Sequence, residues 1–133
     1  MIAVPQTVLD ALAGMYGATA DQLDRFGGGH EESDGIVYAY PRAGLRLLLK
    51  IMAIPTQERR AGIFCLDERL RFVRFLGENG ARIVFPQRSP RGNLYETFLF
   101  GAHTWVGYGM KIAPGKSMPE NTWDPEIFRN WGQ

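Results

Sequence analysis

The stretch Leu45-Arg46-Leu47-Leu48-Leu49-Lys50-Ile51-Met52-Ala53-Ile54 is the most apolar of the chain, and the fold is worked out from it. Its length and branched side chains predict a strand. Alternation puts Lys50 on one face with Leu48 and Met52, and the intervening leucine and isoleucine residues on the other. A lysine on a half-buried face needs a nearby anion, because burial without one lowers the pKa of the amine. The alternative is an edge-strand lysine whose ammonium reaches water.

Toward the N-terminus, residues 36–40 are rich in β-branched and aromatic side chains and predict a second strand, joined to the first by a turn at 41–44. Residues 23–26 predict a third strand, and a glycine-rich turn from Gly27 to Gly35 separates it from the second. Glycine lets the backbone approach a bulky anion and point N–H groups at it. The alternative for this segment is an ordinary hairpin turn. Residues 5–16 predict a short amphipathic helix closed by Gly17.

The pattern becomes helical from Thr56, a candidate N-cap, to about Asn79, with Gly80 as a stop signal. Two apolar strips run along this helix, so we expect it to have neighbours on both flanks. Glu68 lies in the middle of one strip, where an unpaired carboxylate would be costly, so a cation should approach it. The alternative is a surface glutamate, and Glu58 on the same face is the reserve candidate. The strips consist of Ala61, Phe64, Cys65, Phe72 and Phe75, and of Ile63, Leu66, Leu70 and Val73.

Extended patterns return after Gly80. Residues 82–85 and 94–100 predict a hairpin around the turn at 89–93, and residues 104–112 predict a fifth strand that 113–115 break. Residues 121–131 have the pattern of a capped helix start. The fold class we expect is α+β: a five-stranded antiparallel sheet with one long packed helix and short flanking helices.

Composition narrows the class of protein. A chain of 133 residues fits one domain. Its 15 Lys and Arg against 14 Asp and Glu give a net charge of +1, so we expect neither nucleic acid nor an anionic membrane as partner. The single cysteine, Cys65, favours a reducing compartment and predicts a buried structural thiol. With neither a signal peptide nor an apolar run of about 18 residues, we expect a cytoplasmic protein.

The order of strand, glycine loop, strand, lysine strand and helix with an acid resembles the N-terminal lobe of protein kinases. The motifs are most similar to those of the aminoglycoside phosphotransferase family, whose members are kinase-like enzymes that act on small molecules. The similarity spans about residues 20–133. The matching pieces are Gly27-Gly28, Val37-Tyr38, Leu49-Lys50-Ile51, Glu68, Leu76-Gly77-Glu78-Asn79-Gly80, Phe85-Pro86-Gln87-Arg88-Ser89 with Gly92, and Pro114-Gly115.

This resemblance implies a nucleotide-binding lobe, with ATP and Mg²⁺ bound by the full-length parent protein. Lys50 would contact the α- and β-phosphates, and Glu68 would hold Lys50 in place. The backbone from Gly27 to Gly35, which includes Gly28 and Gly29, would cover the phosphates. The acids Glu31, Glu32 and Asp34 in the same loop would repel the phosphates unless they point outward or meet Mg²⁺. The base pocket would be formed by Val37 or Ile36, together with Leu48 and Met110. The hinge would be formed by Lys111, Ile112 and Ala113.

The resemblance also divides the chain into an N-terminal helix at 1–20, the lobe at 21–115, and a linker with the start of a C-terminal lobe at 116–133. The family's catalytic His-x-Asp loop has no counterpart in this sequence. The residue two positions after His30 is Glu32 and the residue two positions after His103 is Trp105, so neither histidine is followed by the required Asp. We interpret Asp124 as an acid at the start of a helix. We therefore expect no catalytic residue and no protein metal ligand in this chain, which would be inactive alone. The small-molecule acceptor would bind the missing lobe, and the exposed lobe surface could support a dimer. The alternative is a non-catalytic α+β interaction domain or a pseudokinase lobe.

Overall fold

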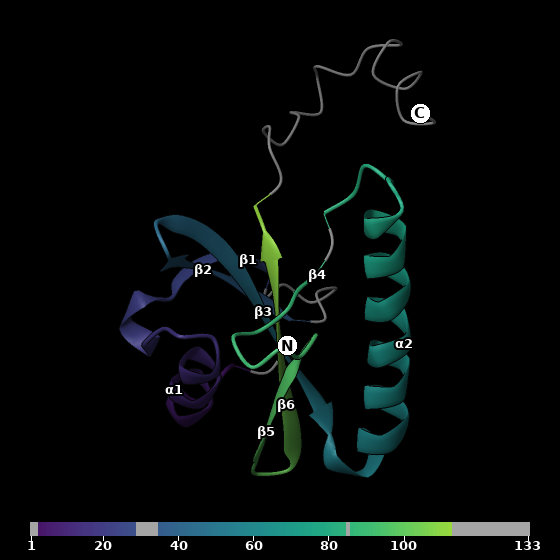
Figure 1. Cartoon of the computed structure of the whole chain (residues 1–133). Helices are drawn as coiled ribbons and strands as arrows, with labels where there is room; N and C mark the ends of the chain where they lie inside the picture. The colour runs from purple at the N-terminus through teal and green to yellow at the C-terminus, as the bar shows by residue number, and fades with distance from the viewer. Residues whose placement is uncertain (1–2, 29–34, 85, 113–133) are drawn as a thin grey trace, which may run out of the picture.

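The computed structural model describes residues 3–28, 35–84 and 86–112 (Figure 1). The expected helix at 121–131 and the segment 116–133 therefore lie outside the described residues, as do Gly29, His30, the loop acids and Ala113. Short 3₁₀ turns precede β1 and α2, at Ala20–Gln22 and Thr56–Glu58. The elements are α1 (Gln6–Met15), β1 (Asp24–Gly28), β2 (Ile36–Arg42), β3 (Leu45–Pro55), α2 (Arg59–Glu78), β4 (Pro86–Gln87), β5 (Glu96–Phe100) and β6 (His103–Lys111).

The strands form one antiparallel sheet in the order β1-β2-β3-β6, and the far edge of β6 is shared by β4 and β5. This confirms the α+β class with five main strands and one long helix. The expected hairpin is wrong, because β4 is displaced to Pro86–Gln87 and pairs with β6 instead of β5. The reason is length: β5 covers β6 only from His103 to Gly107, so the next residues of β6 are free to pair with β4.

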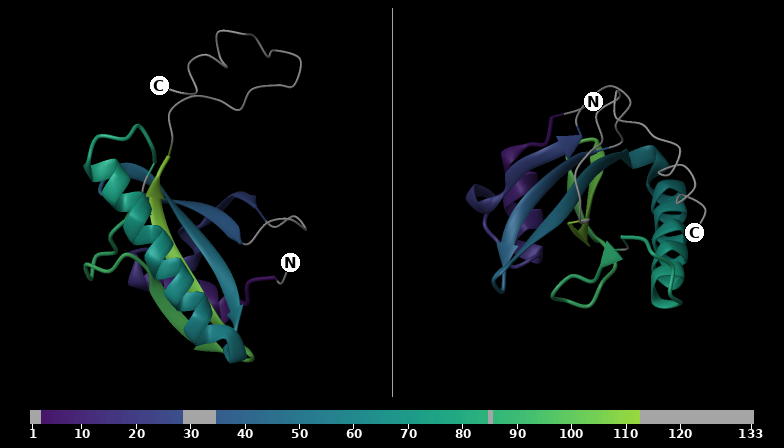
Figure 2. Two further views of the ribbon diagram at one scale, coloured as in Figure 1. Left: turned by 90° about the vertical axis from the view of Figure 1, so that its right-hand side faces the viewer. Right: turned by 90° about the horizontal axis from the view of Figure 1, so that it is seen from above.

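The two faces of the sheet carry separate cores, with α1 on one side and α2 on the other (Figure 2). Period-two alternation along β3 creates this division. Leu49 and Ile51 are fully buried in the core that α1 covers, whereas Ile54 lies in the core that α2 covers. The predicted alternation of this strand is therefore confirmed, and Lys50 belongs to the α2 face.

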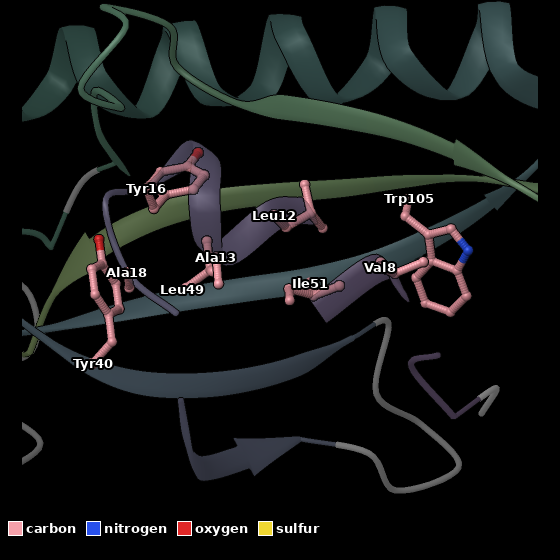
Figure 3. Close-up of a cluster of buried hydrophobic side chains, with 9 residues drawn as sticks. All are labelled: Val8, Leu12, Ala13, Tyr16, Ala18, Tyr40, Leu49, Ile51 and Trp105. Carbon is pink, nitrogen blue, oxygen red and sulfur yellow. The ribbon is translucent and has the colours of Figure 1, made fainter. Parts of the chain in front are cut away.

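Two glycines of β6 let α1 lie close to the sheet. A Cβ on Gly107 would be 3.6 Å from the terminal carbons of Leu12, and one on Gly109 would be 3.5 Å from the ring of Tyr16. The Tyr16 hydroxyl donates a hydrogen bond of 2.9 Å to the Gly107 carbonyl. Burial raises the pKa of this phenol above its ordinary value, and the nearby Glu96 and Tyr40 raise it further. Figure 3 shows Tyr16 and Leu12 between the helix and the strands.

Helix α2 follows β3 almost directly. Thr56 begins a 3₁₀ turn and is not the N-cap of α2, so this prediction is wrong. The N-cap residue of α2 is Glu58. Gly80, at φ +92°, ends the helix as predicted, because glycine adopts this left-handed conformation without strain. The helix packs on the sheet through the strip that contains Leu66 and Leu70.

The other apolar strip of α2 faces solvent, contrary to the expectation of neighbours on both flanks. Phe64, Phe72 and Phe75 are 65%, 60% and 58% exposed. Cys65, which lies beside them, is exposed as well, so the expected burial of its thiol is wrong. Gly62 explains which strip packs: its position approaches Ile54 so closely that a Cβ there would lie 2.8 Å from the isoleucine side chain.

Candidate functional site

The expected base-pocket and lysine positions lie together on one face of the sheet. Lys50 is paired with Val37 of β2 and Tyr108 of β6, and Leu48 is paired with Met110. Side chains of directly opposed residues in antiparallel strands share a face. The structure therefore brings Val37, Leu48, Lys50 and Met110 together. Ile36, the other candidate for the Val37 position, pairs with Ile51 and belongs to the opposite face.

Lys50 lies in a central strand between β2 and β6, which contradicts the alternative of an edge-strand lysine. Its ammonium is 6.0 Å from the centroid of the Tyr108 ring, within the range of a cation–π interaction. On its other side lies Gly35, where a Cβ would be 3.2 Å from the Lys50 Cε and 2.7 Å from the Ile51 carbonyl oxygen. The residue that ends the glycine-rich segment thus rests directly on the lysine.

The first glycines of the expected glycine-rich turn do not lie where the sequence predicted them. Gly27 and Gly28 belong to β1, where they pair with Val37 and Ile36, so the turn that was expected to begin at Gly27 is wrong at its start. A register shift between Arg25 and Gly27 marks a bulge in β1. Gly28 has a φ of +80°, which glycine adopts freely, and the strand ends there. Gly29 lies outside the described residues.

The expected hinge begins where β6 leaves the sheet. Lys111 is the last residue of β6, pairs with Leu47 and is exposed. Ile112 follows it outside the strand and is partly buried. These two residues directly follow Met110, so their backbone continues from the edge of the face that carries Leu48 and Lys50. Ala113, the third expected hinge residue, is beyond the part of the chain that the structure describes.

Glu68 is exposed, so its expected burial is wrong. At 100° per residue it lies about half a turn around α2 from Leu66 and Leu70, which pack on the sheet. The structure therefore turns Glu68 away from the face that carries Lys50 and does not bring the two together. The Lys50–Glu68 pair stays a prediction for an arrangement in which α2 has rotated or shifted.

A groove of about 600 Å³ lies between β3 and α2 on the same face as Lys50. Glu58, the reserve candidate for the buried acid, lines the end of the groove near Pro55. Pro55 is five strand residues, or about 16 Å, from Lys50. The other charged residue of the groove is Arg69, which the sequence did not single out. Gly62 was the available signal, because a glycine inside a helix marks a close approach and so identifies the packed side. The lining is Met52, Ala53, Ile54, Pro55, Glu58, Ala61, Gly62, Cys65, Leu66 and Arg69.

Glu96, a buried acid that sequence reasoning also missed, lies on the face opposite Lys50. It pairs with Gly107, whose position faces α1. Its carboxylate accepts hydrogen bonds of 2.9 Å from the Ser89 hydroxyl and from the Asn93 amide, and Arg91 lies 3.5 Å away. These contacts stabilise the loop between β4 and β5, so Glu96 has a structural role and does not serve Lys50.

Within 3–28, 35–84 and 86–112, no group of three or more His, Cys, Asp and Glu side chains could hold a metal ion. No helix in this part of the chain is both long enough and apolar enough to span a membrane.

An antiparallel sheet of five main strands with one long helix is the fold of a kinase N-lobe. The chain is similar to the solved structure of amicoumacin kinase hAmiN in complex with AMP-PNP, Ca²⁺ and Ami, with a TM-score of 0.76 and 24% sequence identity. The match covers 98% of this chain and 37% of that chain, its N-terminal portion. At this identity the similarity shows the fold. No protein-family model and no curated protein sequence matches the chain.

Proposed function

We propose that this chain is the nucleotide-binding lobe of an ATP-dependent phosphotransferase that acts on a small molecule, as in the aminoglycoside phosphotransferase family. One observation carries the proposal: Lys50 lies in a central strand directly beneath Gly35, on the face that also carries Val37, Leu48 and Met110. The kinase N-lobe fold supports it, because the matched kinase is in complex with the nucleotide analogue AMP-PNP.

Each residue of this face has a proposed role. The apolar side chains of Val37, Leu48 and Met110 would receive the base, and the backbone of residues 111–113 would form hydrogen bonds with its edge. The Lys50 ammonium would contact the α- and β-phosphates. The close contact at Gly35 fits an anion site, because a residue with no side chain lets the backbone lie next to the lysine. Mg²⁺ would arrive bound to the triphosphate.

Transfer would require residues that this chain does not carry. The chain spans 37% of the kinase chain that it matches. The acceptor molecule and the catalytic aspartate loop would belong to a C-terminal lobe, and the 133 residues alone would bind nucleotide without transferring phosphate.

Calorimetric titration of the 133-residue chain with MgATP tests the proposal. We expect saturable binding, and we expect Lys50→Met to weaken it at least tenfold, because a hydrogen bond to a charged group contributes about 1.5–3 kcal/mol. Methionine keeps the apolar stem and removes the charge. Arg46→Met is the matched control, since Arg46 is an exposed cation near the start of the same strand, and it should change the affinity less than twofold. Absence of binding to the wild-type chain would reject the proposal.

A second candidate, a non-catalytic interaction domain or pseudokinase lobe, is favoured by a different observation. The three phenylalanines of α2, Phe64, Phe72 and Phe75, are each more than half exposed, and exposed apolar patches of this kind mark interaction surfaces. A chain that is folded and does not bind MgATP would support the interaction domain. A parent protein that binds MgATP and transfers no phosphate would support the pseudokinase.

A further inference from the structure

The side of α2 that faces solvent carries a row of large apolar side chains, which we call the phenylalanine strip. It consists of Phe64, Phe72 and Phe75, which are 65%, 60% and 58% exposed. At 100° per residue the three lie within about 80° of one another and half a turn from Leu66 and Leu70, which pack on the sheet. Seen from the side of α2, the helix lies in front of the sheet (Figure 2, left). The strip therefore points directly away from the rest of the fold.

The exposed apolar area of the phenylalanine strip has the size of an interface centre. With about 200 Å² for a whole phenylalanine side chain, the three exposed fractions amount to roughly 370 Å² per copy. Exposed apolar patches of about 300–600 Å² on a monomer are often functional. A stable interface takes about 800 Å² from each partner, in an apolar centre with a polar rim. The strip supplies nearly half of this area, which suits a weak and reversible interface.

Two opposite charges lie between the phenylalanines along the helix. Glu68 is exposed in the middle of the strip. Arg71 lies about 60° from it on the border of the strip, and its side chain is 68% exposed although it pairs with Asp67 at 2.6 Å. A guanidinium has five N–H donors, so Arg71 can bind a second carboxylate without leaving Asp67. The strip is thus apolar at its ends and carries one acid and one cation near its centre.

The spacing of these four residues is complementary to itself. Phe64 precedes Glu68 by four residues, and Phe75 follows Arg71 by four residues. A second α2 helix that runs antiparallel and places its Phe75 opposite Phe64 therefore places its Arg71 opposite Glu68. A two-fold axis repeats both contacts. In a parallel pair of helices, Glu68 would instead face its own copy, and the like charges would repel.

We propose that the phenylalanine strip binds a second copy of this chain, with the two α2 helices packed antiparallel about a two-fold axis. Burial of the phenylalanines provides the affinity. The two Glu68–Arg71 pairs across the axis fix the direction and register of the helices, since charges at an interface determine specificity more than strength. This inference goes beyond the proposed function and does not depend on nucleotide binding.

Sedimentation velocity of the 133-residue chain tests the dimer through exchanged charges. We expect a dissociation constant on the order of 10 µM, so the wild type should change from monomer to dimer between about 1 µM and about 300 µM. Glu68→Arg brings arginines together across the axis, and Arg71→Glu brings carboxylates together. Each variant alone should dimerise at least tenfold more weakly. An equimolar mixture of the two variants restores both opposite-charge contacts and should regain most of the affinity.

Phe64→Ala tests the apolar part of the same interface. The two-fold axis makes this truncation count twice in each dimer, so it should weaken dimerisation at least tenfold. Phe26→Ala is the matched control, because Phe26 is a 51% exposed phenylalanine of β1. Its dissociation constant should stay within twofold of the wild type. Since both phenylalanines are exposed, urea unfolding should show that both variants keep the fold.

Three outcomes would overturn the dimer. A wild-type chain that stays monomeric at every concentration would do so, and the strip would then belong to a different partner. Equal effects of Phe64→Ala and Phe26→Ala would place the contact on another surface. Failure of the mixed charge variants to associate would exclude the antiparallel register. Absence of MgATP binding would reject the proposed function and leave this inference standing.

Discussion

Gly35 has no space for a side chain, and this makes it a sensitive position of the site. Gly35→Ala would place a Cβ 2.7 Å from the Ile51 carbonyl oxygen and 3.2 Å from the Lys50 Cε. Because backbone atoms must then move, we expect a loss of about 1–3 kcal/mol in the free energy of unfolding. We also expect weaker MgATP binding, since Lys50 must shift. Urea unfolding and calorimetric titration measure the two effects.

Gly27→Ala is the matched control for Gly35→Ala. Gly27 is also in the glycine-rich region, but a Cβ there would meet nothing within 4 Å. We expect Gly27→Ala to be neutral or slightly stabilising, because alanine restricts the unfolded chain more than glycine does. Equal destabilisation by both variants would contradict the steric explanation.

Tyr16 makes the stability of the fold depend on alkaline pH. Burial raises the pKa of its phenol above the ordinary value of 10.0, so the folded state favours the protonated form. This contribution to stability is fully present below pH 10 and is lost as the pH rises toward the folded-state pKa. We expect the free energy of unfolding to fall above pH 10 by up to about 1.4 kcal/mol per pH unit for this group.

Tyr16→Phe separates this titration from other causes of alkaline unfolding. The variant loses the 2.9 Å hydrogen bond to the Gly107 carbonyl, so it should be about 1 kcal/mol less stable at pH 7. Its stability should fall less steeply above pH 10 than that of the wild type. Parallel curves for the two proteins between pH 9 and pH 11, measured by urea unfolding, would show that Tyr16 does not cause the decline.

At the scale of the element, α2 has two apolar sides with different energetic weight. Leu70 is buried against the sheet, whereas Phe72 is 60% exposed. Leu70→Ala should cost about 2–5 kcal/mol, because it removes buried apolar surface and leaves a cavity. Phe72→Ala should change the free energy of unfolding by about 0.5 kcal/mol or less. Chemical denaturation of the two variants compares them directly, and a larger loss for Phe72→Ala would mean that the Phe72 side is the packed one.

The sequence predicted β3 correctly because a strand has only two sides and its alternation is read residue by residue. The grouping of Lys50 with Leu48 then follows, and so does the placement of Met110 across the ladder. The position of β4 was not predictable in this way. It depends on how much of the β6 edge β5 leaves unpaired, and that is a property of the assembled sheet.

The side of α2 that packs could not be read from hydrophobicity, because both strips are apolar. One helical residue changes direction by 100°, so the choice of strip decides which charged side chain meets the groove. The phenylalanine strip led to Glu68, whereas the charged residue of α2 that lines the groove is Arg69. Gly62 indicates the packed side of α2, but only through its close contact with Ile54. This contact between β3 and α2 exists only in the folded chain.

At the scale of the whole molecule, the sheet contributes residues to two cores, one on each face. The face that carries Lys50 is only partly covered. Helix α1 closes one face over Leu49 and Ile51. On the other face α2 packs through Leu66 and Leu70 in one core with Ile54, and the groove lies beside this contact. A nucleotide bound on the Lys50 face, as we propose, would therefore stabilise the folded state, because this face exists only when the strands are paired.

This arrangement predicts that MgATP raises the thermal midpoint of the 133-residue chain. A ligand at 100 times its Kd that binds only the folded state adds about 2.7 kcal/mol. For a domain of this size that corresponds to a shift of roughly 8–13 °C. Lys50→Met should reduce the shift at the same MgATP concentration, whereas Arg46→Met should keep it. Because the nucleotide would lie on β2 and β3, hydrogen exchange at the amides of these two strands should slow in the wild type and not in Lys50→Met. Unchanged exchange at these amides would mean that the nucleotide does not bind this face of the sheet.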